Sequence, residues 1–99
     1  MNQMQQMIIN AQRMQRELQK AKAALAEKEF AVSKNGMVEL TLFGNRTVKE
    51  IKIDKDALDP ENADMLEETL VLALNEALEA IQKADDEIEE RIAGKPGLF

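Results

Sequence analysis

Apolar residues recur at steps of three and four along the first part of the chain, where neither Gly nor Pro occurs before Gly36. The stripe consists of Met4, Met7, Ala11, Met14, Leu18, Ala21 and Leu25. This spacing predicts one helix over about residues 2–28, with a heptad seam typical of coiled coils. At 1.5 Å per residue the helix is about 40 Å long, which restricts the folds open to a short chain.

Short alternating patterns come next and predict three strands over about residues 29–54. The clearest alternation is that of Val38, Leu40 and Leu42 with Glu39 and Thr41. Two pairs, Asn35-Gly36 and Gly44-Asn45, separate the strands and supply the positive φ angles of tight hairpin turns. In the third strand Val48 is out of phase with Ile51 and Ile53, which indicates a bulge or apolar contacts on both faces.

A second helix is predicted over about residues 60–93, with Asp59 as its cap and Pro60 in its first position. A broad apolar face that includes Leu66, Leu70, Ala73, Leu74, Ala77, Leu78 and Ile81 supports it. Gly94 and Pro96 end the helix and leave a short tail, residues 94–99. We therefore expect residues 1–99 to form one α+β domain, an α-β-β-β-α subunit with a three-stranded antiparallel sheet.

The predicted sheet is too short to cover the first helix. Strands of this length span about 20 Å, half the length of that helix. The helix seam, represented by Met7, Met14, Leu18 and Leu25, is therefore expected to pack in part against a second copy of the chain. The other interpretation is that the seam packs only on its own sheet.

The charges are unevenly distributed, although the net charge is −6. Residues 54–92 contain 14 acidic and three basic side chains, whereas basic residues outnumber acidic ones over residues 1–53. At 100° per residue, Arg13, Arg16 and Lys20 fall within a stripe about 60° wide that faces away from the seam, and Glu17 lies at its edge. This stripe is a candidate phosphate-binding surface, and the alternative is an ordinary solvated face. Further candidates are Lys22, Lys49 and Lys52.

The residue types present give little support to an enzyme or a metal protein. The chain has no Cys, no His and a single serine, Ser33, so the usual nucleophile and base sets cannot form. Asp54, Asp56 and Asp59 only faintly resemble a calcium loop, because the central glycine and the closing glutamate are missing. We expect no catalysis, cofactor, metal or small-molecule substrate, and a cytoplasmic protein without a membrane segment.

The order and spacing of several short segments resemble the YbaB/EbfC family of bacterial nucleoid-associated proteins. These segments are residues 4–7 (MQQM), 11–15 (AQRMQ), 25–29 (LAEKE), 48–54 (VKEIKID), 59–61 (DPE), 65–68 (MLEE), 74–78 (LNEAL) and 96–99 (PGLF). The resemblance implies a tweezer-like homodimer that binds duplex DNA in the nucleoid with little sequence specificity. It also implies a role in nucleoid organisation and gene expression.

A second function class fits the same element order. Prefoldin-like coiled-coil chaperones or adaptors also place helices on both sides of β-hairpins, and they need no DNA. Pro60 and the broad apolar face of the second helix favour packing on a sheet instead, because a coiled-coil seam is narrower.

Overall fold

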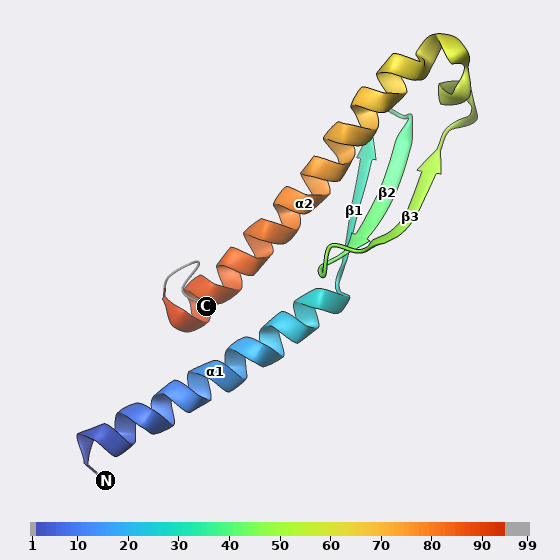
Figure 1. Ribbon diagram of the computed structural model, residues 1–99. Coiled ribbons are helices and arrows are strands. Elements are labelled where there is room, and N and C mark those ends of the chain that lie inside the picture. Colours follow the sequence, from blue (N-terminus) through green and yellow to red (C-terminus); the bar gives the residue numbers. More distant parts are fainter. Residues whose placement is uncertain (1, 95–99) are drawn as a thin grey trace.

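The computed structural model describes residues 2–94 and has the predicted α-β-β-β-α order. The molecule is elongated, with extents of 71 × 19 × 14 Å, and its two helices run antiparallel along part of their length (Figure 1). Of the predicted tail, residues 95–99 lie outside the described part of the chain. The helices and strands are α1 (Gln3–Glu27), β1 (Glu29–Lys34), β2 (Val38–Phe43), β3 (Val48–Ile53) and α2 (Ala63–Ala93).

The three strands form one antiparallel sheet in the order β1-β2-β3. Leu40 at its centre pairs with Val32 of β1 and with Ile51 of β3. The register shifts where Thr41 pairs with Glu50 and the next residue of β2 pairs with Val48. One residue of β3 is therefore extra, and the predicted bulge is confirmed.

The core lies between this sheet and α2. Val38, Leu40 and Leu42 of β2 point toward α2 and are 1% exposed, and they meet Ala73, Ala77 and Ile81, which are fully buried. The small alanines let the helix backbone approach the sheet closely, while the leucines and Ile81 supply the volume. Contacts of α2 with the sheet concentrate on β1 and β2, and all six residues of β3 are exposed. Of the two alternatives for β3, the bulge is therefore the one observed, and apolar contacts on both faces are not seen within the described chain.

The start of the second helix lies later than predicted. Asp59 is a cap, since its Oδ1 accepts a hydrogen bond of 2.9 Å from the backbone N–H of Glu61, and Pro60 occupies the first position after it. These residues begin a single 3₁₀ turn, Pro60–Asn62, and α2 begins only at Ala63. A 3₁₀ turn is a common entry to a helix, and sequence patterns locate such boundaries poorly.

The two hairpin turns use their glycines differently. Asn35 and Gly36 have φ of 56° and 65°, as the sequence predicted. In the second turn the positive φ belongs to Arg46, at 69°, which corrects the assignment to Gly44-Asn45. Gly44 is required for another reason, because a Cβ there would lie 1.8 Å from the carbonyl oxygen of Leu25. This turn packs directly on the C-terminal end of α1.

The seam of α1 is divided between two environments. Leu18 and Leu25 are buried within the single chain, where the C-terminal half of α1 packs against α2. Met14 is half-buried, whereas Met4 and Met7 are 71% and 70% exposed. The N-terminal part of α1 extends past the end of α2 (Figure 1). The helix α2, more than the sheet, covers the part of the seam that is buried.

Candidate nucleic-acid interface

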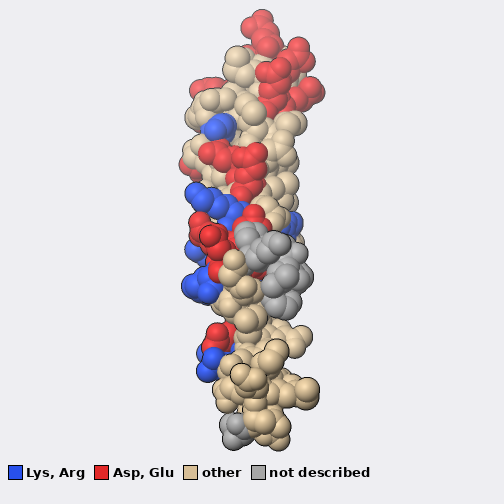
Figure 2. Space-filling model, turned by 90° about the vertical axis from the view of Figure 1, so that its left-hand side faces the viewer, with Lys and Arg blue, Asp and Glu red and all other residues tan. Residues whose placement is uncertain are grey.

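Three exposed basic side chains form a stripe along the middle of α1. Arg13, Arg16 and Lys20 are all exposed, and the buried Leu18 lies on a different face of the same helix. Within residues 2–94, no hydrogen bond or ion pair engages any of these three cations. Lys and Arg side chains gather over the middle of the molecule, while acidic side chains dominate the end where α2 begins (Figure 2). We call Arg13, Arg16 and Lys20 the basic stripe.

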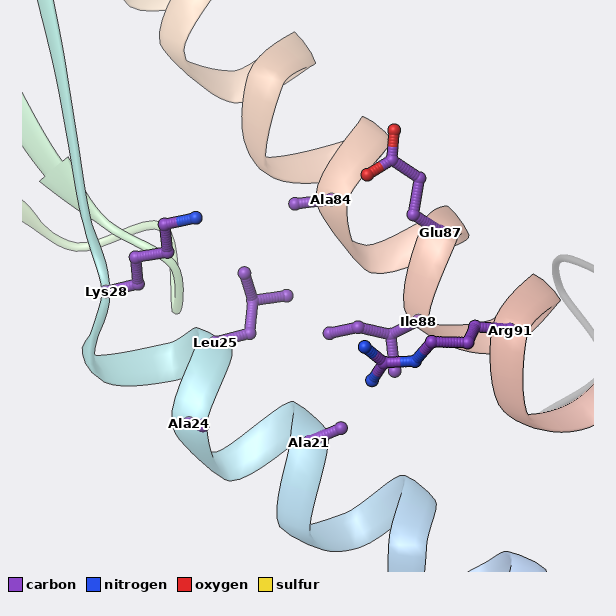
Figure 3. A pocket seen from close by; sticks show the side chains of 8 residues that line it. All are labelled: Ala21, Ala24, Leu25, Lys28, Ala84, Glu87, Ile88 and Arg91. Carbon is purple, nitrogen blue, oxygen red and sulfur yellow. The ribbon is translucent and has the colours of Figure 1, made fainter.

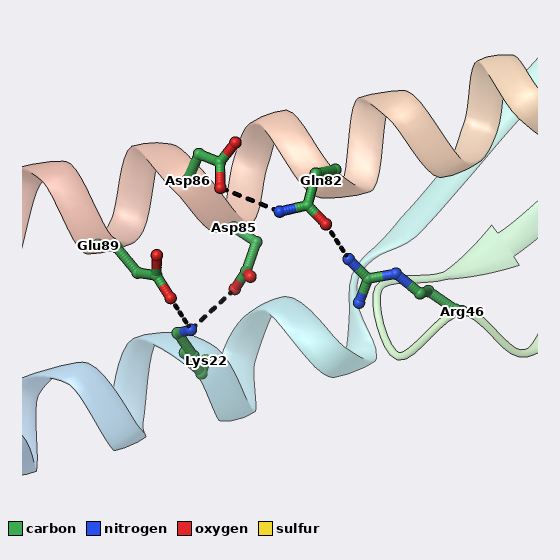
Figure 4. Close-up of polar contacts among 6 residues, drawn as sticks. All are labelled: Lys22, Arg46, Gln82, Asp85, Asp86 and Glu89. Atoms are coloured by element: carbon green, nitrogen blue, oxygen red, sulfur yellow. Dashed lines mark hydrogen bonds and ion pairs between the residues drawn. The ribbon is translucent and has the colours of Figure 1, made fainter. Parts of the chain in front are cut away.

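Lys22 belongs to a different environment, the contact between the two helices. Its Nζ lies 2.6 Å from Glu89 Oε1 and 3.2 Å from Asp85 Oδ1 (Figure 4). The side chain of Glu89 is only 4% exposed, and that of Lys22 is 32% exposed. The Glu89 hydrogen bond raises the pKa of Lys22 above 10.5, and Asp85 adds to this effect while burial opposes it. Lys22 therefore joins α1 to α2, and a contact with phosphate would compete with two carboxylates.

The candidate lysines of β3 also have carboxylate neighbours. Lys49 Nζ lies 2.5 Å from Glu29 Oε1, and this hydrogen bond raises the pKa of Lys49. Lys52 Nζ lies 3.9 Å from Glu50 Oε1, a looser pair between exposed side chains. Exposed ion pairs of this kind are weak, so both lysines can exchange partners. They lie on the sheet, apart from the basic stripe on α1.

A polar chain that the sequence did not indicate ties the second hairpin to α2. Arg46 Nη2 donates to Gln82 Oε1 at 2.8 Å, and Gln82 Nε2 donates to Asp86 Oδ1 at 3.0 Å (Figure 4). The two ends of this chain come from residues 40 positions apart, so no local sequence pattern signals it. The guanidinium of Arg46 therefore holds the second hairpin against α2.

Two acidic residues between β3 and α2 act as caps. Asp54 Oδ1 accepts a hydrogen bond from the backbone N–H of Asp56, and Asp59 acts in the same way for Glu61. Each satisfies a donor at the start of a short 3₁₀ turn. Over residues 2–94, no group of three or more acidic side chains converges in a way that could hold a metal ion.

Comparison with known proteins places this geometry in a family. The sequence pattern of the YbaB/EbfC DNA-binding family matches residues 1–96. The chain belongs to the YbaB/EbfC DNA-binding family. Relatives agree with this assignment over most of their length. The chain is 40% identical to a nucleoid-associated protein of Enterococcus faecalis, over 99% of this chain and 96% of the relative. It is 43% identical to one of Mycoplasmopsis pulmonis, over 88% of this chain and 86% of the relative.

Membership of the YbaB/EbfC family agrees with the predicted resemblance and gives no support to the prefoldin-like alternative. The architecture also differs from that of a prefoldin-like protein, since α2 lies along the sheet instead of pairing with α1 over its full length. Neither of the two helices, over the residues described, is long and apolar enough to cross a membrane.

The structure brings together only some of the predicted site residues. Arg13, Arg16 and Lys20 share one exposed surface, whereas Lys22 faces α2 and is paired with it. Sequence analysis missed the apolar residues that the fold leaves exposed on β3, of which Val48 is 46% exposed. The sequence pattern places Ile51 and Ile53 on one face of β3, and the bulge brings Val48 onto that face. The pattern does not show whether a helix covers it.

Proposed function

We propose that this chain is a nucleoid-associated protein that binds duplex DNA as a homodimer, with little sequence preference, and performs no catalysis. The basic stripe on α1 is the observation that carries the proposal. Its three cations are exposed and free of intramolecular ion pairs within the described residues 2–94, so they are available to phosphate groups. The names of the family and of its relatives support DNA as the partner.

Weak sequence preference follows from the kinds of side chain on this surface. Contacts to phosphate fix a protein on the duplex but carry no sequence information. The proposed contacts are those of three cations, Arg13, Arg16 and Lys20, with phosphate groups, so the binding energy comes mainly from a sequence-independent interaction. We expect dissociation constants in the non-specific range, roughly 10⁻⁴ to 10⁻⁶ M at physiological salt.

The exposed apolar face of β3 supports dimerisation. Val48, Ile51 and Ile53 are cross-strand partners of the buried leucines and valine of β2, so they lie on the same face of the sheet. They are nevertheless 46%, 43% and 37% exposed, because α2 covers mainly β1 and β2. A second copy packed there would bury these side chains and protect the open edge of β3. We therefore place the interface on β3, and not on the seam residues Leu18 and Leu25.

Binding of a fluorescent duplex, measured by anisotropy across a range of salt concentrations, tests the DNA-binding part. The double variant Arg13→Glu with Arg16→Glu should weaken binding. The slope of the logarithm of the binding constant against the logarithm of the salt concentration should become shallower by about 0.9 for each phosphate that the variant no longer neutralises. Lys55→Glu with Lys83→Glu is the matched control, since both lysines are exposed and the change in charge is identical. Equal weakening in the two double variants would refute a site on α1, and no binding of the unmodified chain at low salt would refute DNA as the partner.

The mass in solution tests the dimer. Light scattering after size exclusion should give twice the 11.1 kDa of one chain. Ile51→Asp should shift the protein toward the monomer, because it places a charge in the interface. Ala31→Asp, at an exposed position on β1, introduces the same charge on the other face of the sheet and should leave the dimer intact. A monomeric parent protein, or equal effects of the two variants, would contradict the interface.

A further inference from the structure

The N-terminal part of α1 projects from the molecule as an uncharged helix with large apolar side chains. Residues 2–12 contain no Asp, Glu, Lys or Arg, and this end of the molecule shows no charged side chain in the view of Figure 2. Met4, Met7 and Ile8 are each more than half exposed. We call residues 3–14 of α1 the arm. Exposed apolar side chains that gather in one place, unlike single ones, mark an interaction surface.

The arm continues the seam that α2 covers further along α1. Leu18 and Leu25 are buried there, and Leu25 points toward Ile88 of α2 (Figure 3). The arm repeats the same spacing of three and four residues with Met4, Met7, Ala11 and Met14. Because α1 extends past the end of α2, the seam of the arm lies beyond the helix that covers the rest of it (Figure 1).

The arm is a well-formed helix from its first turn. The side chain of Asn2 accepts a hydrogen bond of 2.8 Å from the backbone N–H of Gln5, and the side chain of Gln5 accepts one from the backbone N–H of Asn2. This capping box satisfies two donors that the start of a helix leaves unpaired. A helical segment as short as the arm is nevertheless marginal in water. A partner that buries the seam would therefore stabilise the arm.

We infer that the arms of two copies of the chain pair antiparallel through this seam, and that the pair bridges two DNA duplexes. In the matching register Met7 lies opposite Ala11 of the other copy, and Met4 lies opposite Met14. The contact is symmetric, because each residue meets in the second copy the residue that its own counterpart meets in the first. At its centre a large side chain meets a small one, which is how facing helices interdigitate.

The charges of the arm favour a second copy as its partner. In this register Arg13 lies level with Gln5 of the other copy, and Arg16 lies level with Asn2, so no like charges face each other. A membrane surface also binds amphipathic helices, chiefly through cations that reach anionic lipids. The cations of α1 point away from the seam, so they would face away from a membrane in which the seam is buried.

Pairing through the seam turns the two basic stripes in opposite directions. At 100° per residue, the centre of the stripe lies about 180° around α1 from the centre of the seam. Two helices that pack seam to seam therefore present one stripe on each outer side. Each stripe can meet the phosphates of its own duplex, so one pair of arms links two duplexes. This step rests on the DNA binding proposed above for Arg13, Arg16 and Lys20.

The contact between two arms is short. From Met4 to Met14 the overlap is about 15 Å long, which is brief for a coiled coil. The pairing is therefore weak in dilute solution, where the dimer through β3 is the expected form. It becomes favourable where a duplex holds several copies close together, because their effective concentration is then high.

Capture of a second duplex tests the bridge. One duplex is fixed to beads, and a fluorescent duplex is added together with the protein. Met4→Gln with Met7→Gln removes the apolar seam of the arm but keeps the charge and a good helix former at both positions. The matched control is Met65→Gln with Leu72→Gln, since these side chains are also more than half exposed but lie on α2.

We expect the arm variant to bind a single duplex as the parent does and to have the same helical content, because Met4 and Met7 are exposed in the single chain. It should capture at least about tenfold less of the second duplex, since the multivalent link is lost. The control should capture as much as the parent. Equal capture by the parent and the arm variant would overturn the inference, and so would a parent that binds one duplex but captures no second one.

Failure of the proposed function has a different signature. A parent protein that binds no single duplex, even at low salt, would refute DNA as the partner, and the bridge would fall with it. Binding of the parent, but not of the arm variant, to vesicles of anionic phospholipid would assign the arm to a membrane surface and overturn the pairing.

Disulfide formation between copies tests the register without DNA, since the chain has no cysteine of its own. At high protein concentration Met4→Cys chains should link to Met14→Cys chains, because a disulfide needs Cα atoms within about 7 Å. Two Met4→Cys chains should not link, because their thiols lie about 15 Å apart along the paired helices. Gln12→Cys replaces Met14→Cys in the control, since Gln12 is exposed on another face of α1. Equal yields from all three combinations would overturn the antiparallel pairing.

Discussion

Replacement of Gly44 by alanine tests the contact between the second hairpin and α1. A Cβ at this position would lie 1.8 Å from the carbonyl oxygen of Leu25 and 2.7 Å from its carbonyl carbon. Both neighbours are backbone atoms, so no side chain can rotate out of the way. Bringing the first distance to 3.0 Å, below which real Cβ contacts essentially never fall, requires the turn and the helix to separate by more than 1 Å.

Two effects lower the stability of the Gly44→Ala variant. The separation weakens two hydrogen bonds, from Gly44 N–H to Lys28 O at 2.8 Å and from Asn45 N–H to Ala26 O at 3.3 Å. Each contributes about 0.5–1.5 kcal/mol, and overpacking adds about 1–3 kcal/mol. We expect the free energy of unfolding to fall by about 2–6 kcal/mol, a large part of the roughly 5–15 kcal/mol typical of a domain. The melting temperature should fall by about 10 °C or more.

Gly36→Ala is the control that separates steric exclusion from backbone conformation. Gly36 has φ of 65°, and a Cβ there meets nothing within 4 Å, so only the left-handed backbone opposes alanine. That strain costs about 1–2 kcal/mol. Thermal unfolding followed by circular dichroism, at one protein concentration for all variants, should rank Gly44→Ala below Gly36→Ala in stability. The reverse order would refute the close approach of the hairpin to α1.

Three further results are expected from the packing and the ion pairs. Leu40→Ala should lower the free energy of unfolding by about 2–5 kcal/mol in denaturant titrations, since Leu40 is 1% exposed at the centre of the core. Lys22→Gln should cost about 1–3 kcal/mol at neutral pH, because it leaves Glu89 without its lysine, and a negligible change would contradict this. Because the pKa of Lys22 is raised, the difference in stability between the parent protein and the Lys22→Gln variant is fully present below pH 10.5. The difference disappears as the pH rises through the folded-state pKa of Lys22, and melting curves at pH 8–12 will detect this loss. Asp59→Ala should cost about 1 kcal/mol because the cap on Glu61 N–H is removed, and an unchanged melting temperature would refute that role.

Local patterns in the sequence determined the elements and their order. The heptad spacing of α1, the alternation in β2 and the apolar face of α2 each reflect which side of an element is buried, so they could be recognised without knowledge of its partner. The Asn35-Gly36 turn and the bulge in β3 were likewise predictable, because both depend on neighbouring residues. The family followed from the order of short segments along the whole chain.

Only the tertiary structure decided which partner each apolar or charged face meets. Leu18 and Leu25 are buried against the same chain, whereas Ile51 has the expected strand pattern but stays exposed. Lys22 looks like its basic neighbours in the sequence, yet Glu89, 67 residues later, engages it. The spacing of apolar residues in the sequence identifies a helix or a strand, because that spacing follows the backbone geometry of the element. Contacts between distant segments depend on how helices and strands cross, and local patterns do not contain that information.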